Sequence, residues 1–399
     1  MPEKVKLDGF KTFIGRHCET TALKRVLDYK GLDISEEMLF GLGGGIGFIY
    51  WYIKTLPAPF IGSRHGKVAD FLKNICRRIG VNATISETSS PKRGYDELKS
   101  LLHAGEPAIV YGDMVSLPYL VMPDIAHFGG HAFVVFGIDE AKGEVYIYDR
   151  SQNTFVISID ELAKARSSKY PPFAPKHKLI SISRTENINS LEDAIKESIR
   201  ECCRDMIEPS IRNIGLPGIE KWSTLVLKWP EKFHDVGLLN ALINGFTYIE
   251  IAGTGGSAFR SMYARFLEES GQILNRPAIL EAAALMWQSA AIWSDIASCF
   301  MPDSLPALGQ MRKLMTEKNR LFEEQGPDAV STMTVMQNDI QELAYKSLGE
   351  LRSPLTFLSD AEQRIIRCHQ IESAAFNILA REVSQAITVQ DINIASPKL

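Results

Sequence analysis

A cysteine at the predicted start of a helix is the residue of this chain best placed to act as a nucleophile. Cys18 is followed by small and apolar residues at helical spacing, at Ala22, Leu23, Val26 and Leu27. This pattern predicts a helix that begins at Cys18. The unpaired N–H groups and the positive dipole end of a helix N-terminus stabilise a thiolate, the form of cysteine that attacks a carbonyl carbon.

The other cysteines of the chain lack this setting. They are scattered through helical patterns, without the dense spacing of a secreted disulfide scaffold, at Cys76, Cys202, Cys203, Cys299 and Cys368. Free cysteine usually behaves as a small buried hydrophobic side chain. We therefore expect these five to be reduced thiols without a catalytic role.

A histidine and an aspartate lie at the two ends of a predicted β-hairpin. Residues 131–150 have the pattern of a strand, a polar turn that contains Gly143, and a second strand. Folding about this turn brings His131, where the first strand starts, roughly opposite Asp149, where the second strand ends. A carboxylate beside an imidazole fixes its tautomer and stabilises the imidazolium. The pair therefore suits a proton exchange with a nucleophile.

Taken singly, each of these three residues has an ordinary structural explanation. A cysteine at a helix start can be buried, a histidine can lie at a strand edge, and an aspartate can cap a turn. Their order along the chain favours the catalytic interpretation over the structural one. Papain-like folds have the same order: a Cys, then a His at the start of a strand, then an Asp at the end of the next strand. We predict that Cys18, His131 and Asp149 form a catalytic triad for acyl transfer.

The elements that must position these residues belong to the first of two predicted domains. The chain has 399 residues, 45% apolar and 23% charged, which is globular composition and enough length for two domains. Up to about residue 185 helix signals mix with apolar strand signals, at 108–111, 132–138, 145–148 and 179–182. We predict an α+β papain-like cysteine domain over residues 1–188.

The second half of the sequence has the pattern of a helical bundle. Apolar residues recur every three or four positions in five segments, at 191–206, 259–274, 277–300, 328–351 and 360–387. Ser359 and Glu362 have the spacing of a capping box, which predicts a helix start there. We predict an all-α helical domain over residues 189–399.

Charge and targeting signals exclude several classes of partner. The formal net charge is −4, which gives no global reason to expect nucleic acid or an anionic membrane as a partner. The charged N-terminus is not that of a secretory signal, and no apolar run reaches the length of a membrane-spanning helix. We expect a soluble, cytoplasmic protein.

Several motifs of the first half are specific. They are HCETTAL at 17–23, SEEMLFGLGGGIGF at 35–48, LPY at 117–119, and HFGGH at 127–131 continuing to Asp149-Arg150. In these strings the chain resembles the N-terminal domain family of butirosin biosynthesis protein H, whose members are aminoglycoside-tailoring acyltransferases with a papain-like, bacteriocin-peptidase-like core. The second half resembles the helical domain often fused to this one, through YIEIAGTGGSAFR at 248–260 and FLEE at 266–269.

The resemblance implies antibiotic biosynthesis and an acyl transfer from a carrier-protein thioester to an amine. Cys18 would attack the thioester, His131 would move the proton, and Asp149 would orient His131. The donor would be a phosphopantetheine thioester on an acyl or peptidyl carrier protein, and the acceptor a small-molecule amine. No metal and no other cofactor is implied. The helical domain would bind substrate or carrier, or dimerise the chain, so a homo-oligomer stays open.

The sequence departs from papain-like peptidases at the oxyanion hole. These peptidases commonly place a glutamine several residues before the cysteine, and residues 1–17 contain none. One donor can be the backbone N–H of Cys18, and the second is open between another backbone N–H near Gly15 and the side chains of Arg16 and Arg64.

Weaker signals add candidates for substrate binding. These candidates are His17, Gly44, Gly45, Arg64, Asp113 and Tyr119. The glycines at 41–47 follow a predicted helix instead of a strand, so we expect close backbone packing instead of nucleotide binding. Asp113 could equally cap a turn. His127 and His131 lack helical metal-site geometry, and a glycine-rich helix entry is favoured over a phosphate site at 254–257.

Two other functions stay open from the residues alone. The same triad would serve a cysteine peptidase or amidohydrolase, because it does not choose between an amine and water as the acceptor. The chain could also be a non-catalytic binding protein in which Cys18 is merely buried.

Overall fold

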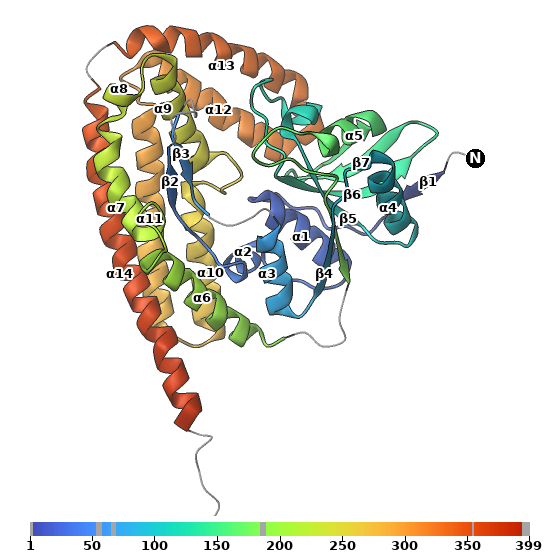
Figure 1. Ribbon diagram of the computed structural model, residues 1–399, viewed down its shortest axis with the longest axis horizontal. Helices are drawn as coiled ribbons and strands as arrows, with labels where there is room; N and C mark the ends of the chain where they lie inside the picture. The colour runs from blue at the N-terminus through green and yellow to red at the C-terminus, as the bar shows by residue number, and fades with distance from the viewer. Residues whose placement is uncertain (1–2, 53–57, 65–68, 184–188, 353–354, 393–399) are drawn as a thin grey trace, which may run out of the picture. The chain divides into compact units, whose positions relative to one another are not determined.

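The computed structural model describes residues 3–52, 58–64, 69–183, 189–352 and 355–392. It confirms the predicted fold class: an α+β region with an antiparallel sheet is followed by a largely helical region (Figure 1). None of the described helices combines the length and the apolar character needed to cross a membrane.

The chain divides into two compact units, each built from three stretches of sequence. The first unit contains residues 1–39, 67–188 and 313–342, and the second contains residues 40–66, 189–312 and 343–399. A stretch of the helical half therefore belongs to the same compact unit as the sheet. The predicted domain boundary near residue 188 lies outside the described residues and stays a prediction.

An antiparallel sheet forms the centre of the first unit. Its strand order is β4-β9-β5-β6-β7-β8, and β1 pairs with β6. The strands are β1 (Lys4–Lys6), β4 (Asn82–Ser86), β5 (Ala108–Gly112), β6 (His131–Asp139), β7 (Glu144–Tyr148), β8 (Thr154–Ser158) and β9 (Leu179–Ser183). The four strand predictions are confirmed as β5, β6, β7 and β9. Every residue of β6 is buried, which is why its sequence is a continuous apolar run.

The helices of the first unit include the one predicted at Cys18. They are α1 (Cys18–Tyr29), α3 (Asp70–Ile79), α4 (Pro91–His103) and α5 (Ile159–Ser167), with short 3₁₀ turns at η1 (Met114–Ser116), η2 (Pro118–Leu120) and η4 (Gly326–Ala329). Helix α1 packs on β6. Its apolar residues Leu23, Val26 and Leu27 are fully buried, so the spacing that predicted the helix is the face that covers the sheet.

The second unit is mainly helical. It contains α6 (Leu191–Ile207), α7 (Gly215–Val226), α8 (Trp229–Lys232), α9 (Val236–Glu250), η3 (Ser257–Phe259), α10 (Arg260–Ile273), α11 (Pro277–Phe300) and α14 (Phe357–Ile392), with the hairpin β2 (Ile49–Trp51) and β3 (Phe60–Gly62). Helix α11 packs along α14 (Figure 1). Three helices contain residues of both units: α2 (Glu36–Leu42), α12 (Pro306–Gln325) and α13 (Val330–Glu350).

The last long helix begins earlier than the capping-box spacing at Ser359 predicts. Helix α14 begins at Phe357, so Ser359 lies inside its first turn and is not the cap. The backbone N–H groups of Leu358 and Ser359 bond to the carbonyls of Leu355 and Thr356. The chain therefore enters the helix through its own backbone turn, which the capping-box spacing did not reveal.

A buried ion pair joins three helices of the second unit. Arg260 on α10 and Glu372 on α14 are fully buried, and Arg260 Nε lies 2.8 Å from Glu372 Oε1. The indole N–H of Trp293 and the hydroxyl of Ser289, both on α11, each donate to Glu372 at 2.7 Å. Arg260 also donates to the carbonyl of Gly47 at 3.1 Å. The ion pair therefore makes hydrogen bonds with groups from α11 and from the segment that contains Gly47.

We predict that Arg260→Ala destabilises the protein by about 3–5 kcal/mol, because removal of one partner leaves the Glu372 carboxylate buried without its counter-charge. The matched control is Arg364→Ala, which removes an exposed pair with Asp295 and should cost at most about 1 kcal/mol. Urea unfolding of the two variants measures the difference. Equal losses of stability would show that the buried pair is not a major support of this unit.

Candidate active site

Cys18 is the first residue of α1 and is partly exposed. Four of the other cysteines are buried: Cys76, Cys202, Cys203 and Cys368. Burial raises the pKa of these four thiols, and it also raises the pKa of Cys299, which is partly exposed. None of the six forms a disulfide. Only Cys18 combines access to solvent with a helix N-terminus, because Cys299 lies near the C-terminal end of α11.

The predicted hairpin brings His131 and Asp149 into contact. Strands β6 and β7 pair antiparallel, with Val134 opposite Tyr148. His131 is the first residue of β6 and Asp149 directly follows β7, so the two residues lie at the same end of this strand pair. His131 Nε2 lies 2.6 Å from Asp149 Oδ2, and both side chains are almost fully buried. The side chain of Cys18 is among the groups that raise the pKa of His131. Asp149 engages Nε2 of the ring, so Nδ1 is the nitrogen that Asp149 leaves unbound.

The electrostatics of the pair favour a charged imidazole. Burial lowers the pKa of His131, but the charge of Asp149 and their hydrogen bond outweigh it, with a further contribution from Cys18, so the pKa lies well above its ordinary value. Burial raises the pKa of Asp149, but the charge of His131 and then Arg150 lower it below its ordinary value.

Three further groups fix the Asp149 carboxylate and its backbone. The hydroxyl of Tyr119 donates to Oδ2 at 2.9 Å, and the backbone N–H of Arg150 donates to Oδ1 at 2.7 Å. Arg25, buried on α1, donates to the Asp149 carbonyl at 3.3 Å and to the Ser151 carbonyl at 2.7 Å. Hydrogen bonds from Arg25 therefore join helix α1, which begins at Cys18, to the segment that follows β7 and contains Asp149.

Tyr119 thus contacts the candidate triad through the carboxylate of Asp149. It is 5% exposed and stacks on Phe155 at a centroid distance of 4.2 Å. Its expected contact with substrate stays untested, and the contact seen is with Asp149.

The turn before Cys18 does not offer a second oxyanion donor from its backbone. The N–H of Gly15 donates to the carbonyl of Arg150 at 2.7 Å. The N–H groups of Arg16 and His17 both donate to the carboxylate of Glu36, at 3.0 and 2.9 Å. The structure therefore disfavours the backbone candidate near Gly15 among those left open, because these N–H groups already have acceptors. The side chain of Arg16 is half exposed and pairs with Glu323 at 3.5 Å.

His17 and Asp113 have structural contacts in the first unit. His17 is the N-cap of α1, and its Nδ1 accepts a long hydrogen bond from the Thr20 N–H at 3.5 Å. The Asp113 carboxylate caps η1 by accepting from the Val115 N–H, and it also binds His127 at 2.7 Å. The turn-cap alternative for Asp113 is therefore confirmed. His127 and His131 bind different carboxylates, so they do not converge on one point.

The glycine-rich candidates lie in the second unit, where they allow close packing. A Cβ on Gly45 would meet the Tyr263 ring at 2.4 Å, and one on Gly44 would lie 3.4 Å from Glu201. Both glycines have positive φ angles. Arg64 belongs to the same unit and lies over the Phe259 ring at 5.9 Å. The substrate-binding roles expected for these three residues stay predictions.

The second glycine-rich motif has an acid where a phosphate would lie. The Ser257 N–H donates to Glu250 Oε1 at 3.3 Å, and a Cβ on Gly256 would lie 3.4 Å from Glu250 Oε2. A carboxylate in this place repels an anionic ligand. The helix-entry interpretation of residues 254–257 is therefore the better one.

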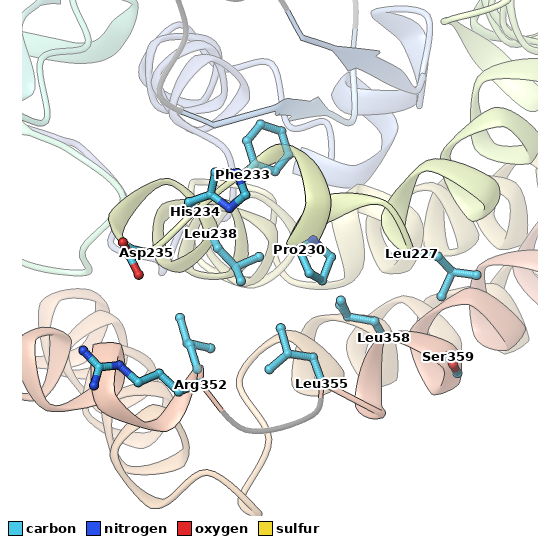
Figure 2. Close-up of a pocket in the computed structure, with 11 residues that line it drawn as sticks. Leu227, Pro230, Phe233, His234, Asp235, Leu238, Arg352, Leu355, Leu358 and Ser359 are labelled. Carbon is cyan, nitrogen blue, oxygen red and sulfur yellow. The ribbon is translucent and has the colours of Figure 1, made fainter.

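A hollow of about 710 Å³ opens on the second unit (Figure 2). Leu238 and Leu355 lie on opposite walls, and the polar side chains of His234, Asp235 and Arg352 gather toward one end. None of the residues predicted as site residues lines it.

Two residues that matter to the site were not found from the sequence. Arg25 and Glu36 are buried charged residues whose partners are distant in sequence or belong to the backbone. Glu36 does fall inside the SEE string that carries the family resemblance, which was the available signal.

The sheet, the helix that begins at Cys18 and the buried His–Asp pair together belong to one α+β region. The chain contains two regions that match family models: residues 17–150 match "Butirosin biosynthesis protein H, N-terminal", and residues 160–325 match a "Domain of unknown function (DUF4872)". The first of these families is related to antibiotic biosynthesis. None of the curated proteins compared with the chain matches it.

Proposed function

We propose that the protein is a cysteine-dependent N-acyltransferase, which moves an acyl group from a carrier-protein thioester through Cys18 to an amine. The observation that carries the proposal is the 2.6 Å contact of buried His131 with Asp149, next to a partly exposed cysteine at a helix N-terminus. The family match supports a biosynthetic direction, in which an amide is made.

The first half-reaction forms the acyl-enzyme. The Cys18 thiolate attacks the thioester carbonyl, a new C–S bond to Cys18 forms, and the C–S bond to the phosphopantetheine arm breaks. The His131 imidazolium gives its proton to the departing thiolate, which leaves as a thiol. Asp149 keeps the ring oriented while its charge changes.

The second half-reaction regenerates the enzyme. An acceptor amine attacks the acyl carbon, the C–N bond forms, and the bond from carbon to Cys18 breaks. Neutral His131 takes the proton that the amine loses, which restores the thiolate and imidazolium. The same residues would serve a hydrolase if water took the place of the amine.

Partition of the acyl group between an amine and water tests the transferase. The purified protein is given acetyl- and hexanoyl-pantetheine thioesters with a panel of primary amines that includes aminoglycosides and polyamines. We expect Cys18-dependent amide product in excess of free acid, measured by mass spectrometry. Free acid without amide for every amine, or cleavage of peptides added in parallel, would favour the hydrolase instead.

A further inference from the structure

One buried carboxylate holds the turn that precedes Cys18. Glu36, the first residue of α2, is 6% exposed. Its two carboxylate oxygens accept from the Arg16 N–H at 3.1 and 3.0 Å, and Oε1 also accepts from the His17 N–H at 2.9 Å. Two consecutive peptide groups are therefore turned toward Glu36.

The same carboxylate also holds the first turn of α1. The hydroxyl of Thr20 donates to Glu36 Oε1 at 2.9 Å, and the hydroxyl of Thr21 donates to it at 2.8 Å. Burial raises the pKa of the Glu36 carboxyl, and the hydrogen bonds from these neighbours act in the opposite direction. Glu36 thus joins the residues on both sides of Cys18 without contacting the thiol by any described hydrogen bond.

Close packing beside this network leaves the turn little room to move. The Cβ of any residue in place of Gly15 would lie 2.1 Å from Thr21 Oγ1, and the Gly15 N–H is bonded to Arg150. Among the described residues, no acceptor is bonded to the N–H of Cys18. The N–H of Cys18 therefore remains available for an oxyanion, while those of the three preceding residues do not.

We propose that Glu36 is the positioning residue of the nucleophile: it fixes the turn before Cys18, so that the Cys18 thiol faces His131 and its N–H faces the reacting carbonyl. The part of this proposal that concerns the oxyanion rests on the proposed function. The part that concerns the direction of the thiol rests on geometry alone. Glu36 acts through the turn and has no contact with the acyl group.

The test compares Glu36→Gln with Glu37→Gln, which alters the next residue of the same helix. An amide in place of Glu36 can keep its oxygen at the Oε1 position, but its NH₂ group then faces the Arg16 N–H, which now meets a donor, so we expect the turn to shift at Arg16. A displacement of about 1 Å in a catalytic group can cost about a hundredfold in rate, so we expect about 10- to 100-fold slower acylation at saturating thioester, with KM changed less than about threefold.

Alkylation of Cys18 by iodoacetamide at pH 7 should slow about tenfold, as the thiol leaves His131. Glu36→Asp, which keeps the carboxylate, should recover part of both rates.

Equal alkylation and acylation rates in Glu36→Gln and Glu37→Gln would overturn the proposal. If Glu36→Gln does not fold, Thr21→Val removes one donor at nearly constant volume, and it should slow alkylation with an unchanged circular dichroism spectrum. An unchanged alkylation rate in that variant would likewise overturn it. Failure of the proposed function has a different signature, in which Cys18 of the unaltered protein reacts with iodoacetamide but never carries an acyl group.

Discussion

Cys18→Ala is expected to lower acyl transfer by about 10⁴-fold or more, because no other group of the site can form the acyl-enzyme. The fold should be retained, since Cys18 is partly exposed and alanine is the best helix former. The measurement is the rate of amide formation from a pantetheine thioester and an amine, together with the thermal unfolding temperature.

Cys299→Ala is the matched control for this variant. Cys299 is also partly exposed and also lies in a helix, but it is in α11 of the second unit. We expect it to keep the activity of the unaltered protein. Full activity in Cys18→Ala, or equal losses in the two variants, would remove Cys18 from the mechanism.

His131→Ala is expected to abolish turnover and also to slow the alkylation of Cys18. The pKa of His131 is raised, so its imidazolium persists through neutral pH and is lost only as the pH rises through the raised value. Within this window we expect the charge of His131 to speed the reaction of Cys18 with iodoacetamide. Without the imidazole, alkylation of Cys18 at pH 7 should be slower than in the unaltered protein.

Stability must be measured alongside, because His131→Ala leaves Asp149 buried without its partner. His131→Gln keeps a hydrogen-bond donor for Asp149 but no charge, so it separates loss of the fold from loss of the imidazolium. We expect both variants to lose turnover by at least about a thousandfold. An unchanged alkylation profile in a folded His131→Gln protein would show that His131 does not support the thiolate.

The elements that carry the candidate site residues were predictable because each has a local signature. The spacing after Cys18 is that of a helix, and the strand–turn–strand pattern of 131–150 places His131 and Asp149 at one end of a hairpin. Both are short-range features of the chain, and both are confirmed as α1 and the β6–β7 pair.

The residues that hold the site together were not predictable in this way. Arg25 and Glu36 lie in charged surroundings that are typical of solvent-facing helix positions, yet both are buried. Arg25 reaches carbonyls more than 120 positions away, at Asp149 and Ser151. No periodic pattern encodes such a pairing, because it is set by the tertiary fold.

The contribution of the helical half to the first unit was missed for a similar reason. Residues 313–342 have ordinary amphipathic helical spacing. This spacing predicts that one helix face is buried, but it does not identify the element that the face packs against. Phe322, for example, stacks on Phe155 of β8, and Glu323 pairs with Arg150 beside Asp149. These contacts place part of the second half behind the candidate active site.

The most direct test of the account is the identity of the residue that carries the acyl group. The unaltered protein is incubated with an acyl-pantetheine thioester without amine, quenched in acid, digested and analysed by peptide mass spectrometry. The account predicts one thioester-linked acyl group on the peptide that contains Cys18, which hydroxylamine removes. An acyl group on another residue, or no acyl-enzyme while amide still forms on addition of amine, would contradict it.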